Sequence, residues 1–257
     1  MNPWLPSLPS VPGGTRVLCL PPSGTGAAFY ASLRRTPAPE GLDLLPVQLP
    51  GRESRLNEPL LTNLRTLAHR AADELGEEFS DGHTMLFGHS MGGALAFELA
   101  VELDRRGGPR PSAVVVSACT PPHAEFLGLP MQDAPDAEFI EMLRRMGGTP
   151  AALLANKEFM AMTVPILRAD LTMCETHRPR GDESLTVPLL TVGGSLDEEV
   201  SVDWLAGWKR YARAGFAGVV APGGHHYLLE PAGARSVANL LLRARDLSAE
   251  NTPTTPR

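Results

Sequence analysis

One serine stands in a setting that could make it a nucleophile. Ser90 lies between Gly88 and Gly92, an apolar stretch over 84–88 precedes it, and an alanine-rich helical pattern follows at once. A sharp turn from strand to helix would expose its hydroxyl, and the turn needs small flanking residues because a Cβ there would collide with neighbouring elements. The pattern predicts a nucleophilic Ser90, with the Met91 N–H directed at developing negative charge. The alternative is a glycine-rich turn with a bystander serine.

A serine hydroxyl needs a base to take its proton, and the base usually needs a third group to fix its tautomer. In hydrolases with this kind of turn, the acid and then the histidine follow the serine along the chain, each after a strand. The apolar stretch 216–221 leads into a glycine pair and then into His225 and His226. We favour His225 as the base because it directly follows the glycines, and we keep His226 as the alternative.

The acid is expected after the preceding strand. The apolar stretch 187–192 leads into a second glycine pair and then into Asp197 and Glu198. The loop after the stretch 112–118 carries no carboxylate, which favours Asp197 as the acid, with Glu198 as its competitor. A Ser-His-Asp triad requires no metal and no organic cofactor.

The loop at 23–26 follows another apolar stretch and precedes a helical pattern, an order that could cradle a phosphate. However, it lacks the Gly-Lys-Ser/Thr ending of a phosphate-binding loop and the third glycine of a dinucleotide fingerprint. In a hydrolase this loop would instead supply the second backbone donor of an oxyanion hole, which we place at the N–H of Ser23.

The elements that must hold these residues alternate between strand and helix. Apolar stretches predict strands at 16–20, 42–49, 84–88, 112–118, 187–192 and 216–221. Helical patterns cover 63–79, the stretch from the serine turn to about 106, 202–213 and 231–246. This alternation predicts a mostly parallel, doubly wound α/β sheet. We expect one catalytic domain over 15–247, an N-terminal extension over 1–14 and a flexible tail over 248–257.

Roughly 65 residues separate the strands at 112–118 and 187–192, far more than a crossover needs. We therefore expect an insert at about 120–182, with helices over 136–146 and 156–175. Six of the nine methionines fall in it, and they either pack a helical core or line an acyl chamber. These are Met131, Met142, Met146, Met160, Met162 and Met173.

Composition restricts the class of protein. The 257 residues carry a net charge of −6, which argues against a nucleic-acid-binding surface. Cys19, Cys119 and Cys174 are odd in number and widely spaced, so we expect neither a disulfide framework nor a thiolate metal site, and we expect a reducing cytoplasm. The N-terminus lacks the pattern of a secretory signal, and no apolar run is long enough to span a membrane.

Several stretches together resemble the free-standing type II thioesterases of polyketide and nonribosomal peptide synthetases, which are α/β hydrolases. The matching residues are Cys19-Leu20-Pro21, Val47-Gln48-Leu49-Pro50-Gly51-Arg52-Glu53, Phe87 to Gly93, Leu167-Arg168-Ala169-Asp170, Gly193-Gly194 with Asp197 and Val200, and Pro222-Gly223-Gly224-His225. Relatives commonly have His-Ala-Gly-Gly in the first loop, where this chain has Pro22-Ser23-Gly24-Thr25.

The resemblance implies an α/β hydrolase fold in which the insert is a helical lid. It also implies an editing activity: hydrolysis of acyl groups from the phosphopantetheine arm of acyl or peptidyl carrier proteins, which clears stalled or misprimed chains. Two other functions stay open, namely an esterase or lipase acting on oxygen esters, and a noncatalytic interaction protein of the same fold.

A basic surface could attract the phosphate of the carrier's arm. Because the insert holds more acidic than basic residues, any such docking patch would have to be local. Arg34, Arg35, Arg52 and Arg55 are the candidates.

Overall fold

The computed structural model describes residues 2–6, 13–30, 41–124, 133–146 and 149–250. Arg34, Arg35, Met131 and the end of the expected tail, 251–257, lie outside the described residues.

The described part of the chain forms one sheet of six strands in the order β2-β1-β3-β4-β5-β6, and every neighbouring pair is parallel. The strands are β1 (Thr15–Leu20), β2 (Leu42–Pro46), β3 (Met85–His89), β4 (Val114–Ser117), β5 (Leu189–Gly194) and β6 (Phe216–Ala221). This arrangement confirms the predicted α/β architecture.

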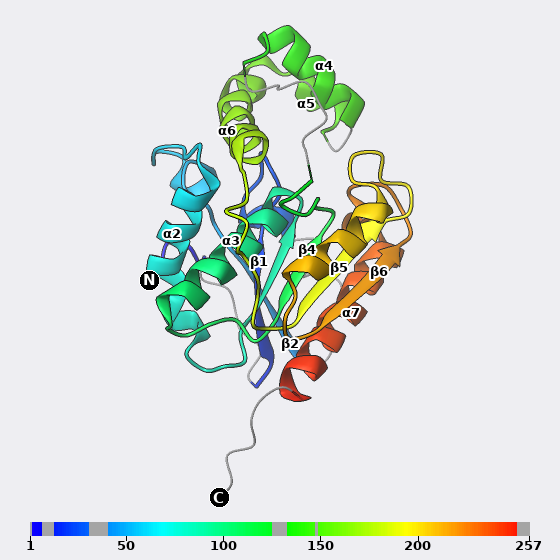
Figure 1. Ribbon diagram of the computed structural model, residues 1–257. Coiled ribbons are helices and arrows are strands. Elements are labelled where there is room, and N and C mark those ends of the chain that lie inside the picture. Colours follow the sequence, from blue (N-terminus) through cyan, green and yellow to red (C-terminus); the bar gives the residue numbers. More distant parts are fainter. Residues whose placement is uncertain (1, 7–12, 31–40, 125–132, 147–148, 251–257) are drawn as a thin grey trace, which may run out of the picture.

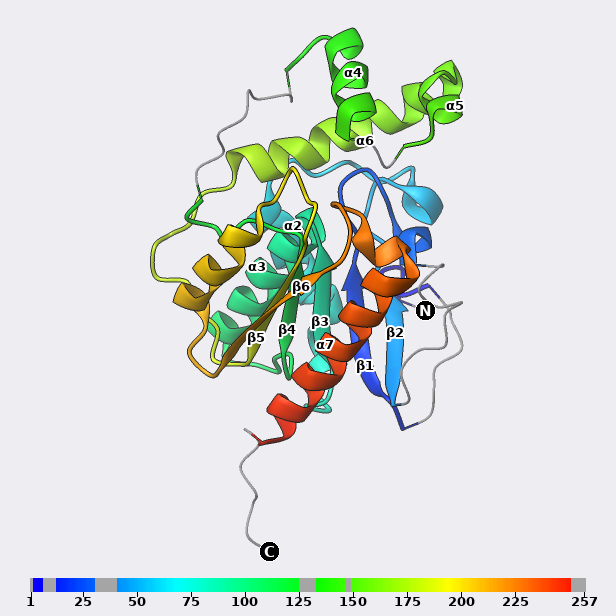
Figure 2. The same ribbon diagram turned by 90° about the vertical axis from the view of Figure 1, so that its right-hand side faces the viewer.

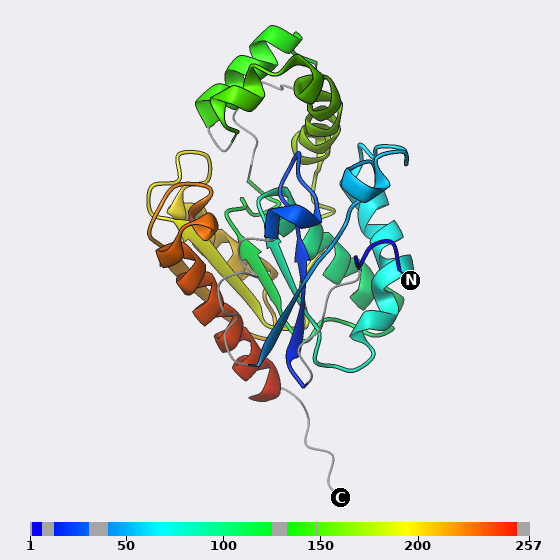
Figure 3. The same cartoon turned by 180° about the vertical axis from the view of Figure 1, so that it is seen from behind.

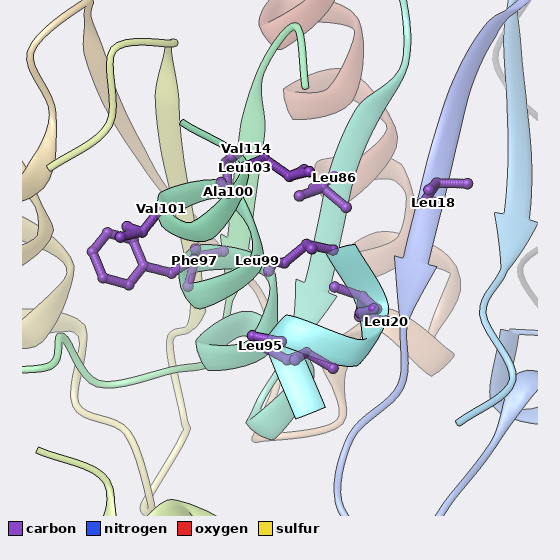
Figure 4. Packing of buried hydrophobic residues seen from close by; sticks show 14 of the residues in the cluster. Leu18, Leu20, Leu86, Leu95, Phe97, Leu99, Ala100, Val101, Leu103 and Val114 are labelled. Carbon is purple, nitrogen blue, oxygen red and sulfur yellow. The ribbon is translucent and has the colours of Figure 1, made fainter. Parts of the chain in front are cut away.

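Helices cover both faces of the sheet, because alternate strand side chains point to opposite faces. Leu18 and Leu20 of β1 share a hydrophobic cluster with α2 (Leu64–Leu75) and α3 (Met91–Arg106). Val17 and Cys19, the intervening residues, join the cluster beneath α7 (Pro231–Glu250). Figure 4 shows the first of these layers, in which leucines of α3 face the strands, and Figures 1 and 2 show α7 on the opposite side from α2 and α3. The core is therefore built of two layers separated by the sheet.

Short 3₁₀ helices complete the connections: η1 (Ala27–Tyr30), η2 (Glu53–Arg55), η3 (Gly76–Phe79), η4 (Val202–Tyr211) and η5 (Tyr227–Leu229). The predicted strand 42–49 ends earlier, at Pro46. Beyond it the Val47 N–H still bonds to the Cys19 carbonyl of β1 at 2.9 Å, and the Gln48 N–H bonds on the other side to the carbonyl of Trp4 at 2.8 Å. Trp4 is fully buried, so this part of the expected N-terminal extension belongs to the core. At the other end α7 continues to Glu250, so 248–250 are helical and the expectation of a flexible tail is wrong for them.

The insert between β4 and β5 holds α4 (Asp136–Met146), the unanticipated short helix α5 (Ala151–Leu154) and α6 (Lys157–Thr176). Figures 1 and 2 show these helices grouped beyond one end of the sheet. They form a small cluster of their own, composed of Phe139, Leu143, Leu154, Met160, Val164 and Leu167. Met160 thus packs in the insert, whereas Met173 packs in the main core and Met162 is exposed.

The direction of the strand order reverses between β1 and β3. These strands are neighbours, but the chain goes from β1 to β2 on one side and from β3 to β4 on the other. In parallel α/β sheets such a switch in direction separates the two loops at the carboxyl ends of the strands, and ligands bind there. Among the described helices, none is long and apolar enough to cross a membrane.

Candidate active site

Ser90 occupies the strained turn that the sequence predicted. Its φ of 55° and ψ of −121° lie outside the regions that a residue with a side chain normally adopts, at a cost of about 1–3 kcal/mol. The Ser90 N–H bonds to the Ser117 carbonyl at 2.8 Å, which ties the turn to β4. A Cβ on Gly88 would lie 1.9 Å from the Gly92 carbonyl oxygen, and one on Gly92 would lie 2.1 Å from that of Leu20. Both glycines are therefore required by close backbone approach.

His225 and Asp197 are brought together from the loops after β6 and β5. The Nδ1 atom of His225 lies 2.9 Å from the Oδ2 atom of Asp197. The two loops approach closely because both contain glycines, and a Cβ on Gly194 would lie 2.5 Å from the Gly224 carbonyl oxygen. Of the two candidate acids, Asp197 makes this bond, whereas Glu198 is exposed.

Both oxygens of the Asp197 carboxylate have hydrogen-bond partners. Its other oxygen, Oδ1, accepts the backbone N–H groups of Glu199 and Val200, each at 2.9 Å. Burial raises the pKa of Asp197, but the hydrogen bond and charge of His225 and these two N–H groups outweigh burial, so the pKa is lowered overall. Asp197 is therefore held as a carboxylate with a fixed orientation.

The carboxylate of Asp197 also influences the pKa of His225. Burial disfavours the charged imidazolium, but the hydrogen bond to Asp197 and the charge of Glu199 outweigh it, so the pKa of His225 is raised above its usual value. Glu199 approaches the second ring nitrogen, with 3.8 Å between Nε2 and Oε2. Sequence reasoning missed Glu199, although its place two residues after the predicted acid could have indicated it.

His226, the alternative base, lies against the ring of His225. Its Nδ1 atom is buried without a hydrogen-bond partner in the described part of the chain. Burial, together with the nearby charge of His225, lowers the pKa of His226. The ring of His226 packs edge-on against that of His225 at 5.2 Å, so it belongs to the wall around the base.

His89, the residue before the serine, is the last residue of β3. It is fully buried, and its Nδ1 atom lies 2.8 Å from the Ser117 hydroxyl, which in turn lies 2.5 Å from the Tyr227 hydroxyl. The Tyr227 hydroxyl also lies 3.1 Å from the Val192 carbonyl oxygen. These contacts tie His89 to β4 and to the segment that follows β6.

His89 also supports the base. Its ring centre lies 5.2 Å from that of His225, which places His225 beside the serine turn. Burial, with the nearby charges of His225 and His226, lowers the pKa of His89 well below its usual value. The group beneath the base is therefore neutral and does not oppose a positive charge on His225.

The two predicted oxyanion donors are backbone N–H groups, so their hydrogen bonds decide whether they are free to bind an oxyanion. Within the described part of the chain, neither the Met91 N–H nor the Ser23 N–H has an acceptor. Met91 begins α3, so its N–H is one of the free groups at a helix N-terminus. The next N–H of the first loop, that of Gly24, is instead bonded to Asp170 at 2.7 Å.

The prediction of a basic docking patch is wrong for Arg52 and Arg55, the two candidate arginines that the structure describes. Arg52 and Arg55 have only 3% and 7% of their surface exposed. Arg52 is paired with Asp170, and Arg55 is paired with Glu58 and lies over the ring of Trp4. Their guanidinium groups are used inside the fold, although Glu53 and Ser54 between them are exposed.

Comparison with known proteins agrees with this architecture. The family model described as thioesterase domain matches residues 15–244. The gramicidin S biosynthesis protein GrsT of Aneurinibacillus migulanus is 34% identical over 84% of this chain and 83% of its own length. The medium-chain S-acyl fatty acid synthase thioesterase of Homo sapiens is 31% identical over 91% of this chain and 88% of its own.

A solved structure gives the same result at the level of the fold. The RedJ thioesterase from the prodiginine biosynthetic pathway in Streptomyces coelicolor superimposes with a TM-score of 0.81, at 28% identity, over 94% of this chain and 98% of that one. Because the family model spans nearly all of the sheet and both loops that carry the serine and the histidine, the chain belongs to the thioesterase domain family, hydrolases that act on thioester bonds.

Proposed function

We propose that this chain removes acyl groups from the phosphopantetheine arms of acyl or peptidyl carrier proteins, and so edits stalled or misprimed polyketide or nonribosomal peptide synthetases. The observation that carries the proposal is the hydrogen bond between His225 and Asp197 beside the strained turn at Ser90. Membership of the thioesterase family supports a thioester substrate. Relatives named for gramicidin S and prodiginine biosynthesis support a carrier-bound one.

Each residue has a stated role in the reaction. Ser90 Oγ attacks the thioester carbonyl while His225 Nε2 takes its proton, and Asp197 keeps the other ring proton on Nδ1. The N–H groups of Met91 and Ser23 bind the oxyanion. The carbon–sulfur bond then breaks, and the thiol leaves with the proton from His225. Water, deprotonated by the same nitrogen, attacks the acyl-serine and releases the acid.

One feature favours a thioester over an amide, and another assists the reaction in general. A thiol has a pKa of about 8.5, so it departs more readily than an amine or an alkoxide. The imidazolium formed on His225 faces two carboxylates, those of Asp197 and Glu199, and lies above a neutral His89. This environment stabilises the charge that develops on the base during both halves of the reaction.

The surroundings of the site fit the same proposal. The insert would act as the lid over the acyl group, since α6 contacts the loop that carries Ser23. The proposal includes a cytoplasmic location, supported by Cys19, Cys119 and Cys174, none of which is joined in a disulfide. The partners would be carrier proteins and small acyl substrates rather than nucleic acid, in keeping with the net charge of −6.

The test compares wild type with Ser90→Ala on one acyl group presented in three ways: on a carrier protein, on free pantetheine, and as an oxygen ester. We expect Ser90-dependent turnover that is fastest on the carrier. Preference for the oxygen ester would make the protein a general esterase. No turnover of any substrate would support a noncatalytic interaction protein.

A further inference from the structure

A buried ion pair joins the insert to the loop after β2. The guanidinium of Arg52 binds the carboxylate of Asp170 with both ends, at 2.6 Å for Nη1 to Oδ2 and 2.9 Å for Nη2 to Oδ1. The side chains of the two residues are 4% and 0% exposed. A pair this deeply buried pays a large desolvation penalty, so it contributes little net stability, and replacing it with apolar residues of similar volume is often neutral. We therefore ask which neighbouring groups the Arg52–Asp170 pair holds in place.

Both partners of the pair contact the backbone of the first loop. Asp170 Oδ2 accepts the Gly24 N–H at 2.7 Å, and Arg52 Nη1 lies 3.4 Å from the Thr25 carbonyl oxygen. The bond at Gly24 involves a charged acceptor and is therefore stronger and more directional than a neutral one. It fixes the peptide plane that directly follows Ser23.

The same face of α6 contacts this loop at two further points. Leu167, Asp170 and Cys174 are spaced by three and four residues, so they lie along one side of the helix. A Cβ on Gly24 would lie 2.4 Å from a methyl carbon of Leu167, and Cys174 lies close enough to Ser23 for the Ser23 side chain to lower the pKa of the thiol, against the larger opposite effect of burial. Figure 3 shows the loop after β1 reaching up to α6.

We propose that Asp170, held by Arg52, is a positioning residue that aims the Ser23 N–H at the oxyanion. With the Gly24 peptide fixed, only the φ and ψ of Ser23 separate that plane from the Ser23 N–H. The C-terminal part of α6 is thus a fixed wall of the oxyanion hole rather than a lid that swings free. This inference rests on the proposed function, because it gives Asp170 a role only if Ser90 forms a tetrahedral adduct.

The principal variants are Asp170→Asn, which keeps the shape of the side chain, and the double variant Arg52→Met with Asp170→Leu, which leaves no buried charge unpaired. Loss of one oxyanion donor costs about 10²- to 10³-fold in kcat, so a misaimed donor should cost about 10- to 100-fold. We expect the KM for a pantetheine thioester and the melting temperature of the double variant to stay close to wild type. Asp136→Asn is the control, because it breaks the ion pair between Asp136 of α4 and Arg168 of α6 within the insert and leaves the pair between α6 and the loop intact.

A second readout separates positioning from a merely structural role. An alkyl boronic acid forms a tetrahedral adduct with a nucleophilic serine, and its affinity should fall by the same factor as kcat/KM in both variants. A folded variant with wild-type kcat and boronate affinity would overturn the inference. The proposed function would instead be overturned if wild-type protein did not turn over the thioester, or if Ser90→Ala kept the wild-type activity.

A measurement on wild type covers the case in which the variants do not fold. When the boronate binds, the amide proton signal of Ser23 should move downfield in the NMR spectrum, while that of Gly24, already bonded to Asp170, should stay. An unmoved Ser23 signal would overturn the positioning role, whatever the variants do.

Discussion

Replacing Asp197 with asparagine tests the acid of the triad with almost no change in shape. The Oδ1 atom of Asp197 accepts two backbone N–H groups, from Glu199 and Val200, each at 2.9 Å. An asparagine must keep its carbonyl oxygen there, because its NH₂ group cannot face two donors. Its NH₂ group would then face the Nδ1 atom of His225, which lies 2.9 Å from Oδ2 in the native protein.

This orientation predicts the size of the loss. The ring nitrogen facing the amide would have to accept a hydrogen bond, so the proton of His225 would move to Nε2, the nitrogen that should take the proton of Ser90. The wrong tautomer costs about 10⁴-fold in kcat, or about 5.5 kcal/mol of transition-state stabilisation. Stability should change much less, by about 1 kcal/mol or about 2–4 °C in Tm, because both backbone bonds remain.

The assay is the release of free thiol from an acyl-pantetheine, normalised to the fraction of Ser90 that reacts with a fluorophosphonate. Glu198→Gln is the matched control, since this neighbouring carboxylate is exposed, and we expect its kcat to stay within twofold of wild type. An Asp197→Asn enzyme that kept more than about one tenth of kcat would refute the tautomer argument. A large loss in Glu198→Gln instead would move the acid to that residue.

Further predictions concern the pH profile, the turn and the insert. His225 must be neutral to act as the base, and its pKa is raised, so kcat/KM should rise with pH through a midpoint above about 6.5. Glu199→Gln should shift that midpoint downward, because it removes a negative charge 3.8 Å from the His225 ring. Gly88→Ala should destabilise by about 3 kcal/mol or more in chemical unfolding, because its Cβ would meet backbone, whereas Gly108→Ala, with open space around it, should not. Phe139→Ala leaves a cavity at a fully buried site in the insert, so it should speed amide hydrogen exchange in α4 without affecting β3 to β5. Met162→Ala, its control at an exposed site, should leave the exchange rates unchanged. Uniform exchange across the sheet in Phe139→Ala would mean that the insert and the sheet unfold together.

Local patterns were enough to predict most of the fold. The strand 216–221 and the helix 136–146 match the observed elements at both ends, because each is bounded by residues that stop it and each has a clear apolar period. The burial of Trp4 was missed because its carbonyl accepts the N–H of Gln48, which is about forty residues away in the sequence. No local pattern reports such a contact.

The residues of the site divide in the same way. The prediction of Ser90, Asp197 and His225 needed only local patterns, because each sits at a fixed place after a strand, next to glycines that the close approach of backbone requires. The burial of Arg52 was missed, because an arginine in a polar loop is usually solvated and its partner, Asp170, lies 118 residues later.

The amino-acid sequence by itself therefore determined the order of strands and helices, the place of the nucleophilic turn and the loops that carry its two partners. These features follow from hydrophobic period and from glycines, and both act between residues that are close along the chain. Only the tertiary structure decided which acid and which histidine meet, that Glu199 faces the second nitrogen of the base, and that a helix of the insert holds the first loop. Those contacts join segments that come together only when the sheet is assembled, because their partners are chosen by packing and burial in space.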